Sequence, residues 1–150
     1  MNEQLEFKPL FDEDFLALVP KHHPLAQQNS VQWPELYACP FVTLQHPSIV
    51  RHLLEQNAQQ HGLILDLKVE CHQISTLSSL VALDIGVSAI PRHFQNFIDK
   101  EHNVLLEIEN SDVHQAVGIV YKKDGELSNV SLQFIEALTR FSYASILKSA

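Results

Sequence analysis

A strand, a helix and a second strand in close succession constrain this chain more than any other feature of its sequence. Residues 65–71 alternate apolar and polar side chains, the period of a strand with one face in a core. Apolar residues then recur at helical spacing from Leu77 to Ile85, and a second apolar run ends at Pro91. Strands joined through a helix in this way favour a parallel sheet that is covered by helices.

The start of that helix is a candidate anion site. We expect Ser75 or Thr76 to cap the helix, and Gly86 to end it in the left-handed conformation. Free N–H groups at a helix start can hold a small anion. No side chain in residues 75–91 pairs a nucleophile with a base, so the segment predicts binding and not catalysis.

The remaining elements fit an α/β fold with a mainly parallel sheet flanked by helices. Short apolar or alternating runs predict further strands at residues 15–20, 40–44, 104–108 and 113–121. Apolar spacing and end signals predict helices at residues 33–37, from Ser48 up to Gly62, and from near Ser128 onward.

Composition limits the classes to which the chain can belong. With 150 residues it is one domain by length, and such a chain buries roughly 70% of the surface that its unfolded form exposes. The net charge of −8 argues against direct binding to nucleic acid, which depends on Lys and Arg. Two cysteines without C-x-x-C spacing indicate a reducing, cytoplasmic setting. We expect neither a secretion signal before Phe15 nor a membrane span.

Several short motifs stand in an order that is typical of one protein family. They are residues 14–19, His23-Pro24-Leu25-Ala26, Glu35-Leu36, Pro40-Phe41-Val42, Leu80-Val81-Ala82, residues 85–91, and Leu127-Ser128 with Phe134-Ile135. In this order and at these gaps they resemble the effector-binding domain of LysR-type transcriptional regulators. One residue departs from the pattern: the family's turn usually has two glycines, and Asp84 stands where the first would be.

The resemblance implies an incomplete domain of the periplasmic-binding-protein-like (type II) fold. Members of the family carry an N-terminal winged helix-turn-helix, a linker helix and a two-lobed effector domain with the ligand between its lobes. By resemblance, residues from about 15 to 117 correspond to lobe two, and residues from about 118 to 150 to the returning strand and last helix of lobe one. This implies a homo-oligomer that contacts DNA only through an N-terminal domain absent from this chain.

The last predicted helix presents an apolar face that the missing part of lobe one would normally cover. This face consists of Leu132, Ile135, Leu138 and Phe141. Apolar surface of this size rarely stays in water. We therefore expect the helix to fold back on its own chain or to pack against a second copy.

Two loops are candidates for ligand binding, because ligands of open parallel sheets lie at the carboxyl ends of the strands. They span residues 43–48 and 74–76. The resemblance implies that the effector contacts Thr43, Gln45, Ser48, Ser75 and Thr76. The simpler explanation for either serine alone is that it only caps its helix. Together the two loops could hold a small carboxylate, and we expect a small metabolite of this kind as the effector.

Metal and redox chemistry find little support in the sequence. The chain has nine histidines, but no pair has the spacing of a zinc site, and scattered surface histidines are the better explanation. The family's peroxide-responsive branch would need a cysteine within residues 45–48, and none is there. Cys71 belongs to the apolar face of its strand, where a thiol is normally inert. We expect no cofactor and no metal.

Other functions remain as alternatives. A solute-binding protein of a transport system would share the general fold, and a secretion signal or lipid anchor would distinguish it. A serine hydrolase would need a motif such as G-x-S-x-G, of which Gly86 and Ser88 supply only half. We therefore expect no catalytic residue and no enzymatic activity.

Overall fold

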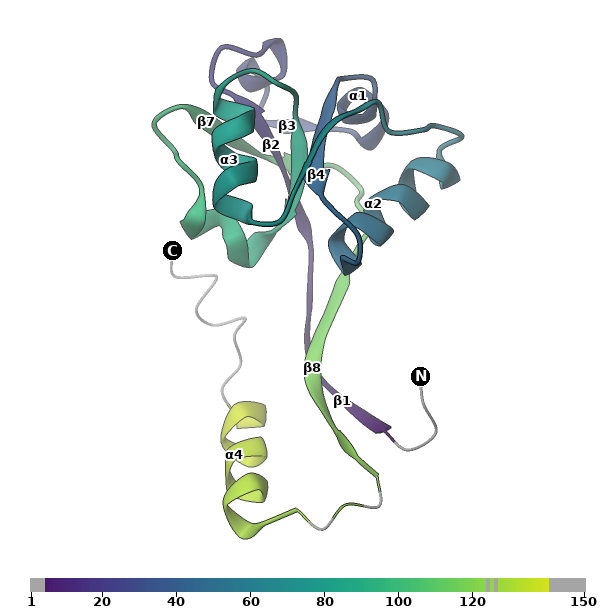
Figure 1. The fold of residues 1–150 in the computed structure, drawn as a ribbon, viewed down its shortest axis with the longest axis vertical. Coiled ribbons are helices and arrows are strands. Elements are labelled where there is room, and N and C mark those ends of the chain that lie inside the picture. The colour runs from purple at the N-terminus through teal and green to yellow at the C-terminus, as the bar shows by residue number, and fades with distance from the viewer. Residues whose placement is uncertain (1–4, 124, 126, 141–150) are drawn as a thin grey trace. The chain divides into compact units, whose positions relative to one another are not determined.

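The computed structural model describes residues 5–123, 125 and 127–140, which belong to two compact units (Figure 1). The larger unit is Asp14–His114, and the smaller one combines Met1–Glu13 with Gln115–Ala150. The assignment of these units to two lobes stays a prediction. No helix in the described part of the chain combines the length and the apolar character needed to cross a membrane.

The larger unit is built on a sheet. Its strands are β2 (Phe15–Pro20), β3 (Ser30–Val31), β4 (Phe41–Leu44), β5 (Leu67–Cys71), β6 (Ser88–Pro91) and β7 (Asn103–Ile108). Their pairing gives the orders β3-β7-β2-β6 and β4-β5. Val87 joins the two parts: its N–H donates to the Pro40 carbonyl, and its own carbonyl accepts from the Val42 N–H, both at 2.8 Å.

The strands are mainly parallel, as predicted, with β2 as the exception among the described strands of this unit. The pairs β3–β7 and β4–β5 are parallel, whereas β2 is antiparallel to both β6 and β7. The register of β2 with β7 shows this exception directly. Leu16 pairs with Glu107 and Pro20 with Asn103, so β2 begins at the same end of the sheet at which β7 finishes.

Helices cover both faces of this sheet. They are η1 (Pro24–Gln27), α1 (Trp33–Tyr37), α2 (Ile49–Gln60), α3 (Ile74–Ala82) and η2 (Arg92–Phe97), of which η1 and η2 are 3₁₀ helices. Alternate residues of β2 enter two cores: Ala17 packs with side chains of α1 and α2, and Leu18 packs with side chains of α3. All six residues of β2 are buried, which explains its unbroken apolar sequence.

The predicted ends of α2 are confirmed, but both predicted ends of α3 are wrong. Gln73 is the N-cap of α3, so Ser75 and Thr76 lie inside its first turn. The helix starts early because Ile74 already packs against the core beside α3. At the other end, the left-handed residue is Asp84, with φ of 60°, and not Gly86.

Gly86 has a different role in the fold. A Cβ atom at this position would lie 2.5 Å from the Pro40 carbonyl oxygen, closer than any side chain tolerates. Glycine is therefore required because β4 passes directly over this backbone. Asp84 instead takes the place of the family's first glycine, and its carboxylate lies 3.2 Å from His22 Nε2.

The smaller unit contains an antiparallel strand pair and a helix. The strand β1 (Leu5–Glu13), which sequence patterns did not predict, pairs with β8 (Gln115–Lys122). Helix α4 (Asn129–Arg140) starts after Ser128, whose hydroxyl oxygen accepts a hydrogen bond from the Ser131 N–H at 3.1 Å. No described residue of α4 is buried. Phe141 of the predicted apolar face lies outside the described residues.

Candidate functional site

The carboxyl ends of β4 and β5 lie next to each other. Leu44 pairs with Cys71, and the Gln45 N–H donates to the Cys71 carbonyl at 2.9 Å. The loop that leads into α2 and the loop that leads into α3 therefore begin side by side. This edge of the sheet is where ligands of open parallel sheets bind.

Charged side chains hold the first turn of α2 in place. Ser48 is the N-cap, and its hydroxyl accepts a hydrogen bond from the Arg51 N–H at 3.4 Å. The buried guanidinium of Arg51 pairs with Glu55 at 2.6 Å and with Glu70 at 2.8 Å. Capping thus accounts for Ser48 as an acceptor, while its O–H remains a donor that a ligand could use.

Thr43 contributes a buried hydroxyl to this edge. The residue is only 1% exposed, and its Oγ1 has no hydrogen-bond partner among the described residues. Leaving such a group without a partner costs about 1–3 kcal/mol. Buried polar atoms are normally paired, so this hydroxyl is available to an ordered water or to a ligand that reaches it.

The first turn of α3 carries free hydrogen-bond donors. Gln73 makes no side-chain capping bond, and Ser75 and Thr76 are exposed. The first N–H groups of a helix have no partner within it and carry partial positive charge. This turn can therefore bind a small anion through backbone N–H groups and through the hydroxyls of Ser75 and Thr76.

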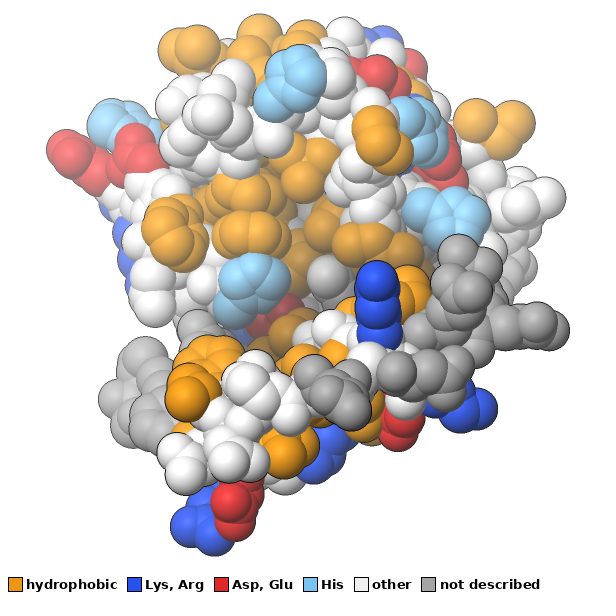
Figure 2. All heavy atoms as spheres, turned by 60° about the horizontal axis from the view of Figure 1, so that its bottom comes forward, with side chains coloured by type: hydrophobic (Ala, Val, Ile, Leu, Met, Phe, Trp, Pro, Cys, Tyr) orange, Lys and Arg blue, Asp and Glu red, His pale blue; other side chains and the backbone are white. Residues whose placement is uncertain are grey.

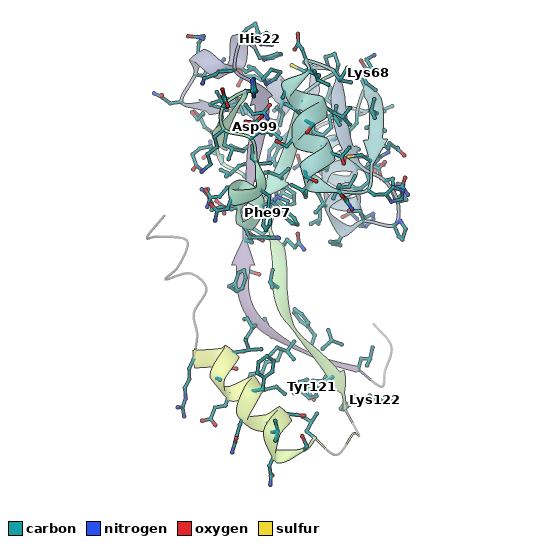
Figure 3. The ribbon with its side chains drawn as sticks, turned by 60° about the vertical axis from the view of Figure 1, so that its left-hand side comes forward. His22, Lys68, Phe97, Asp99, Tyr121 and Lys122 are labelled. Carbon is teal, nitrogen blue, oxygen red and sulfur yellow. The ribbon has the colours of Figure 1, made fainter. Side chains whose placement is uncertain are left out.

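A cavity of about 400 Å³ opens beside this turn. The residues that line it are Leu44, His72, Gln73, Ile74, Ser75, Phe94 and Phe97. Phe94 and Phe97 come from η2, and their ring centroids lie 6.3 Å apart in an edge-to-face arrangement. Phe97 is labelled in Figure 3, and Figure 2 shows hydrophobic side chains gathered in a hollow on one face.

The structure brings only part of the predicted site to this cavity. Ser75 lines it, and so does Leu44, which lies between the predicted residues Thr43 and Gln45. The other four predicted residues are not among its lining residues. Thr43 lies in β4, Gln45 and Ser48 in the loop that leads into α2, and Thr76 in the first turn of α3. Whether these five residues bind the effector stays a prediction.

The sequence patterns do not mark Phe94 and Phe97, the two phenylalanines of the cavity. The segment that carries them follows Pro91, which ends β6, and β6 pairs with β2 in the same sheet. The segment therefore begins at the carboxyl end of a third strand. Ligands of open parallel sheets lie at such ends, so this segment was a candidate for ligand binding on the same grounds as the other two. The residues of this short 3₁₀ helix follow neither the period of an α-helix nor that of a strand, so no pattern in the sequence marks it.

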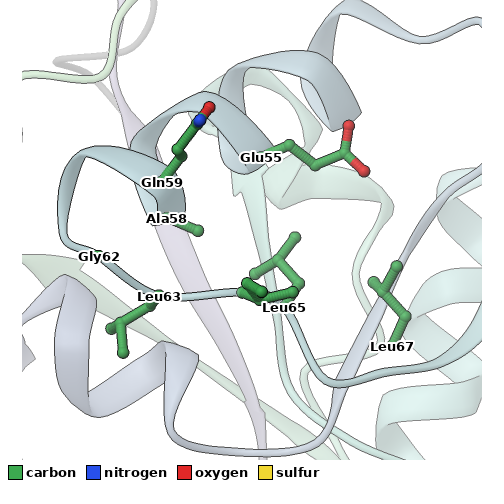
Figure 4. Close-up of a pocket in the computed structure, with 8 residues that line it drawn as sticks. Glu55, Ala58, Gln59, Gly62, Leu63, Leu65 and Leu67 are labelled. Carbon is green, nitrogen blue, oxygen red and sulfur yellow. The ribbon is translucent and has the colours of Figure 1, made fainter.

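A second cavity, of about 500 Å³, lies at the opposite end of α2 (Figure 4). Its walls include Ala58, Gly62, Leu65 and Leu67. Because Leu67 is the first residue of β5, this cavity lies beside the amino end of that strand. It is thus separate from the carboxyl-end loops.

Among the described residues, one group has the composition of a metal site. Asp99, Glu101 and His102 hold potential ligand atoms within 4.8 Å of one another, and all three are exposed. His102 Nδ1 lies 2.8 Å from an Asp99 carboxylate oxygen, and this contact lowers the pKa of Asp99. The hydrogen bond by itself explains why the group is close together.

The two thiols lie in unreactive surroundings. Burial raises the pKa of both Cys39 and Cys71, so little thiolate forms at neutral pH. The position of Cys71 in the apolar set of its strand was predicted and is confirmed, since only 7% of the residue is exposed. Both thiols are free.

Curated relatives of the chain are transcriptional regulators. The chain is 28% identical over 137 residues to the uncharacterized HTH-type regulator YbhD of Escherichia coli, covering 91% of this chain and 43% of YbhD. It is 29% identical over 134 residues to the dual regulator GltC of Bacillus subtilis, covering 89% of this chain and 45% of GltC. The chain thus spans less than half the length of these two relatives.

Solved structures share the fold. The effector-binding domain of QuiR in complex with shikimate matches with a TM-score of 0.81 at 20% identity, over 95% of this chain and 68% of that one. The CcmR regulatory domain of Synechocystis with 2-PG gives 0.82 at 17% identity, over 95% and 69%. The BenM effector-binding domain with benzoate gives 0.81 at 18% identity, over 97% and 66%. These domains have the α/β fold that was predicted.

The family follows from the sequence itself. The model of the LysR substrate binding domain matches residues 1–142, which is nearly the whole chain. The motif order, the sheet with α2 and α3 on its two faces, and the neighbouring structures agree with this match. The chain belongs to the LysR substrate-binding domain family.

Proposed function

We propose that this chain is the ligand-sensing part of a LysR-type transcriptional regulator and that it binds a small carboxylate. The observation that carries the proposal is the cavity beside α3, where a helix start without a side-chain cap adjoins the carboxyl ends of β4 and β5. QuiR, CcmR and BenM are relatives in fold whose structures hold shikimate, 2-PG and benzoate. Each of these small molecules carries a carboxylate.

In this proposal the two loops hold the effector together. The first turn of α3, with Ser75 and Thr76, binds the carboxylate. Thr43 contacts it from the carboxyl end of β4, and Gln45 and Ser48 contact it from the loop that follows. Binding favours one arrangement of lobes and subunits over another. The free energy of binding thus couples the effector to the arrangement of the regulator. No catalytic step, cofactor or metal is assigned to the chain.

The remaining parts of the proposal concern the whole regulator. It forms a homo-oligomer in the cytoplasm and contacts DNA through a separate N-terminal domain. Residues from about 15 to 117 form lobe two, and residues from about 118 to 150 return to lobe one. The family match and the regulator names of YbhD and GltC favour this proposal over a solute-binding protein of a transport system.

The test replaces Ser75 and Thr76 together by Ala and measures binding of benzoate, shikimate and 2-phosphoglycolate by calorimetry. We expect the tightest of these ligands to bind about tenfold more weakly, because two hydrogen-bonding hydroxyls are lost. Ser79→Ala is the matched control, since Ser79 lies on the same helix beyond its first turn and donates only to the Ser75 carbonyl. Equal affinity of the double variant and the unchanged chain would contradict the site.

A further inference from the structure

We propose that the cavity beside α3 selects carboxylates that carry a flat apolar ring, such as an aromatic ring. This inference rests on the function proposed above and adds the chemical class of the effector. It assigns the contact with the ring to Phe94 and Phe97, two residues that neither the sequence motifs nor the helix starts point to.

The wall of the cavity opposite the helix turn is apolar. Leu44 and the two phenylalanines supply this apolar lining together with Ile74, which belongs to the turn itself, while polar groups come from His72, Gln73 and Ser75. A cavity of about 400 Å³ falls in the range that holds small ligands. A benzoate-sized molecule can place its carboxylate at the first turn of α3 and its ring against the phenylalanines.

Phe97 is held in an exposed position by its neighbours. The residue is 66% exposed, whereas Ile98, the next residue, is 7% exposed and packs in the core beside α3. The Asp99 N–H donates to the buried Ser78 hydroxyl at 3.0 Å. A large apolar side chain presented to water by a well-anchored segment is typical of a binding surface.

Phe94 offers the second ring contact from a partly buried position. It packs against the same core and meets Phe97 edge to face. Aromatic rings prefer such edge and offset arrangements, and a ligand ring inserted beside this pair extends them. The two rings thus form a preformed surface for one further ring.

The charges around the cavity disfavour highly charged effectors. No Lys or Arg is among the described residues that line it. Arg92, which begins η2, directs its guanidinium to Asp14 and Glu107, and these contacts use four of its five N–H donors. Phosphate groups are usually bound by Arg or Lys, so the first turn of α3 would have to hold both anionic groups of a phosphorylated acid without a Lys or Arg beside it, and we expect such an acid to bind more weakly than a singly charged carboxylate.

The inference is tested by adding each of two probes to the chain and measuring the changes in backbone amide chemical shifts by NMR. The probes are benzoate and 2-phosphoglycolate. We expect benzoate to shift the amides of Ser75, Phe94 and Phe97 and to bind more tightly than 2-phosphoglycolate. Phe97→Ser weakens benzoate binding about fivefold, as expected for losing one aromatic contact, and leaves the affinity for 2-phosphoglycolate unchanged.

Two further variants separate a ring contact from a general loss of structure. Phe97→Tyr keeps the aromatic ring, so we expect this variant to bind benzoate as tightly as the unchanged chain does. Ile64→Ser is the control, because Ile64 is 91% exposed and lines the other cavity, so its loss leaves both affinities unchanged.

The outcomes distinguish this inference from the proposed function. Tighter binding of 2-phosphoglycolate at the same amides, or unchanged benzoate affinity in Phe97→Ser, overturns the inference and leaves the carboxylate site standing. If neither probe shifts the amides of Ser75 and Thr76, the proposed site and this inference both fail.

Discussion

The guanidinium of Arg92 donates hydrogen bonds to both carboxylate oxygens of Asp14, at 2.9 Å from Nε and 2.7 Å from Nη2. The Arg92 N–H also donates to the Asp14 carbonyl at 3.0 Å, and the same guanidinium reaches Glu107 on β7. Asp14 is the first residue of the larger unit, and Arg92 is the first residue of η2. This pair therefore ties the segment that carries Phe97 to the residue at which the chain enters the unit.

The first prediction concerns this pair. Arg92→Met should lower the free energy of unfolding by about 1 kcal/mol, a modest loss because Asp14 and Glu107 remain partly in water. Urea denaturation followed by circular dichroism measures it. Arg140→Met is the control, since its pair with Glu136 is an exposed one within a helix and should change stability by less than about 0.5 kcal/mol. Equal effects of the two substitutions would contradict a special role for Arg92.

The second prediction is the pH dependence that the pair implies. Hydrogen bonds from Arg92 hold the pKa of Asp14 below its ordinary value of 3.8. A carboxyl whose pKa is lower in the folded state stabilises the fold above its unfolded pKa, and this contribution disappears as the pH falls through the folded value. Asp14→Asn should therefore destabilise the protein at neutral pH and have little effect in strong acid. Urea denaturation at a series of pH values from neutral to strongly acidic measures this change. An effect of Asp14→Asn that does not change with pH would rule out this linkage.

Elements with a clear period could be predicted from the sequence. Alternation identified β5, and apolar spacing with Ser48 and Gly62 as end signals identified α2. The strand β1 was not predicted because its acidic and apolar residues do not alternate throughout: only Glu13 is buried, and exposed and half-buried positions follow one another without a period of two. β8 has no buried residue, but its apolar run was long enough to predict a strand there.

The site was harder to predict than the fold, for a physical reason. Thr43 and Ser75 follow from strand ends and helix starts, which are local signals. Phe97 does not, because its position depends on Arg92 reaching Asp14, a residue 78 positions away. The role of Gly86 likewise depends on β4 crossing its backbone, which no local rule reveals.

The third prediction compares two glycines. Gly86→Ala should lower the free energy of unfolding by about 1–3 kcal/mol, because the added Cβ would overlap the Pro40 carbonyl. Gly62→Ala should cost about 1 kcal/mol for its left-handed conformation alone, since no atom lies within 4 Å of the added Cβ. Thermal and urea unfolding of both variants measures the difference. A smaller effect at Gly86 than at Gly62 would contradict the close approach of β4.

The fourth prediction concerns the apolar face of α4. Of this face, Leu132 is exposed, and Ile135 and Leu138 are only half-buried in the described structure. Val130 and Phe134 of the same helix are exposed as well. Because such a surface seldom remains in water, we expect the chain either to associate with a second copy or to cover this face with another part of itself. Light scattering and limited proteolysis distinguish these results: a dimer supports the first, and a monomer with a protected helix supports the second.

Substitutions on α4 complete this test. Leu132→Glu with Ile135→Glu should convert a dimer into a monomer, or make α4 of a monomer sensitive to protease, because burying two new carboxylates is unfavourable. Gln133→Glu is the matched control, since it adds a charge at an exposed polar position of the same helix and should change neither property. A monomer of the unchanged chain whose α4 is cleaved as readily as in the double variant would contradict the expectation, because the apolar face would then lie uncovered in solution.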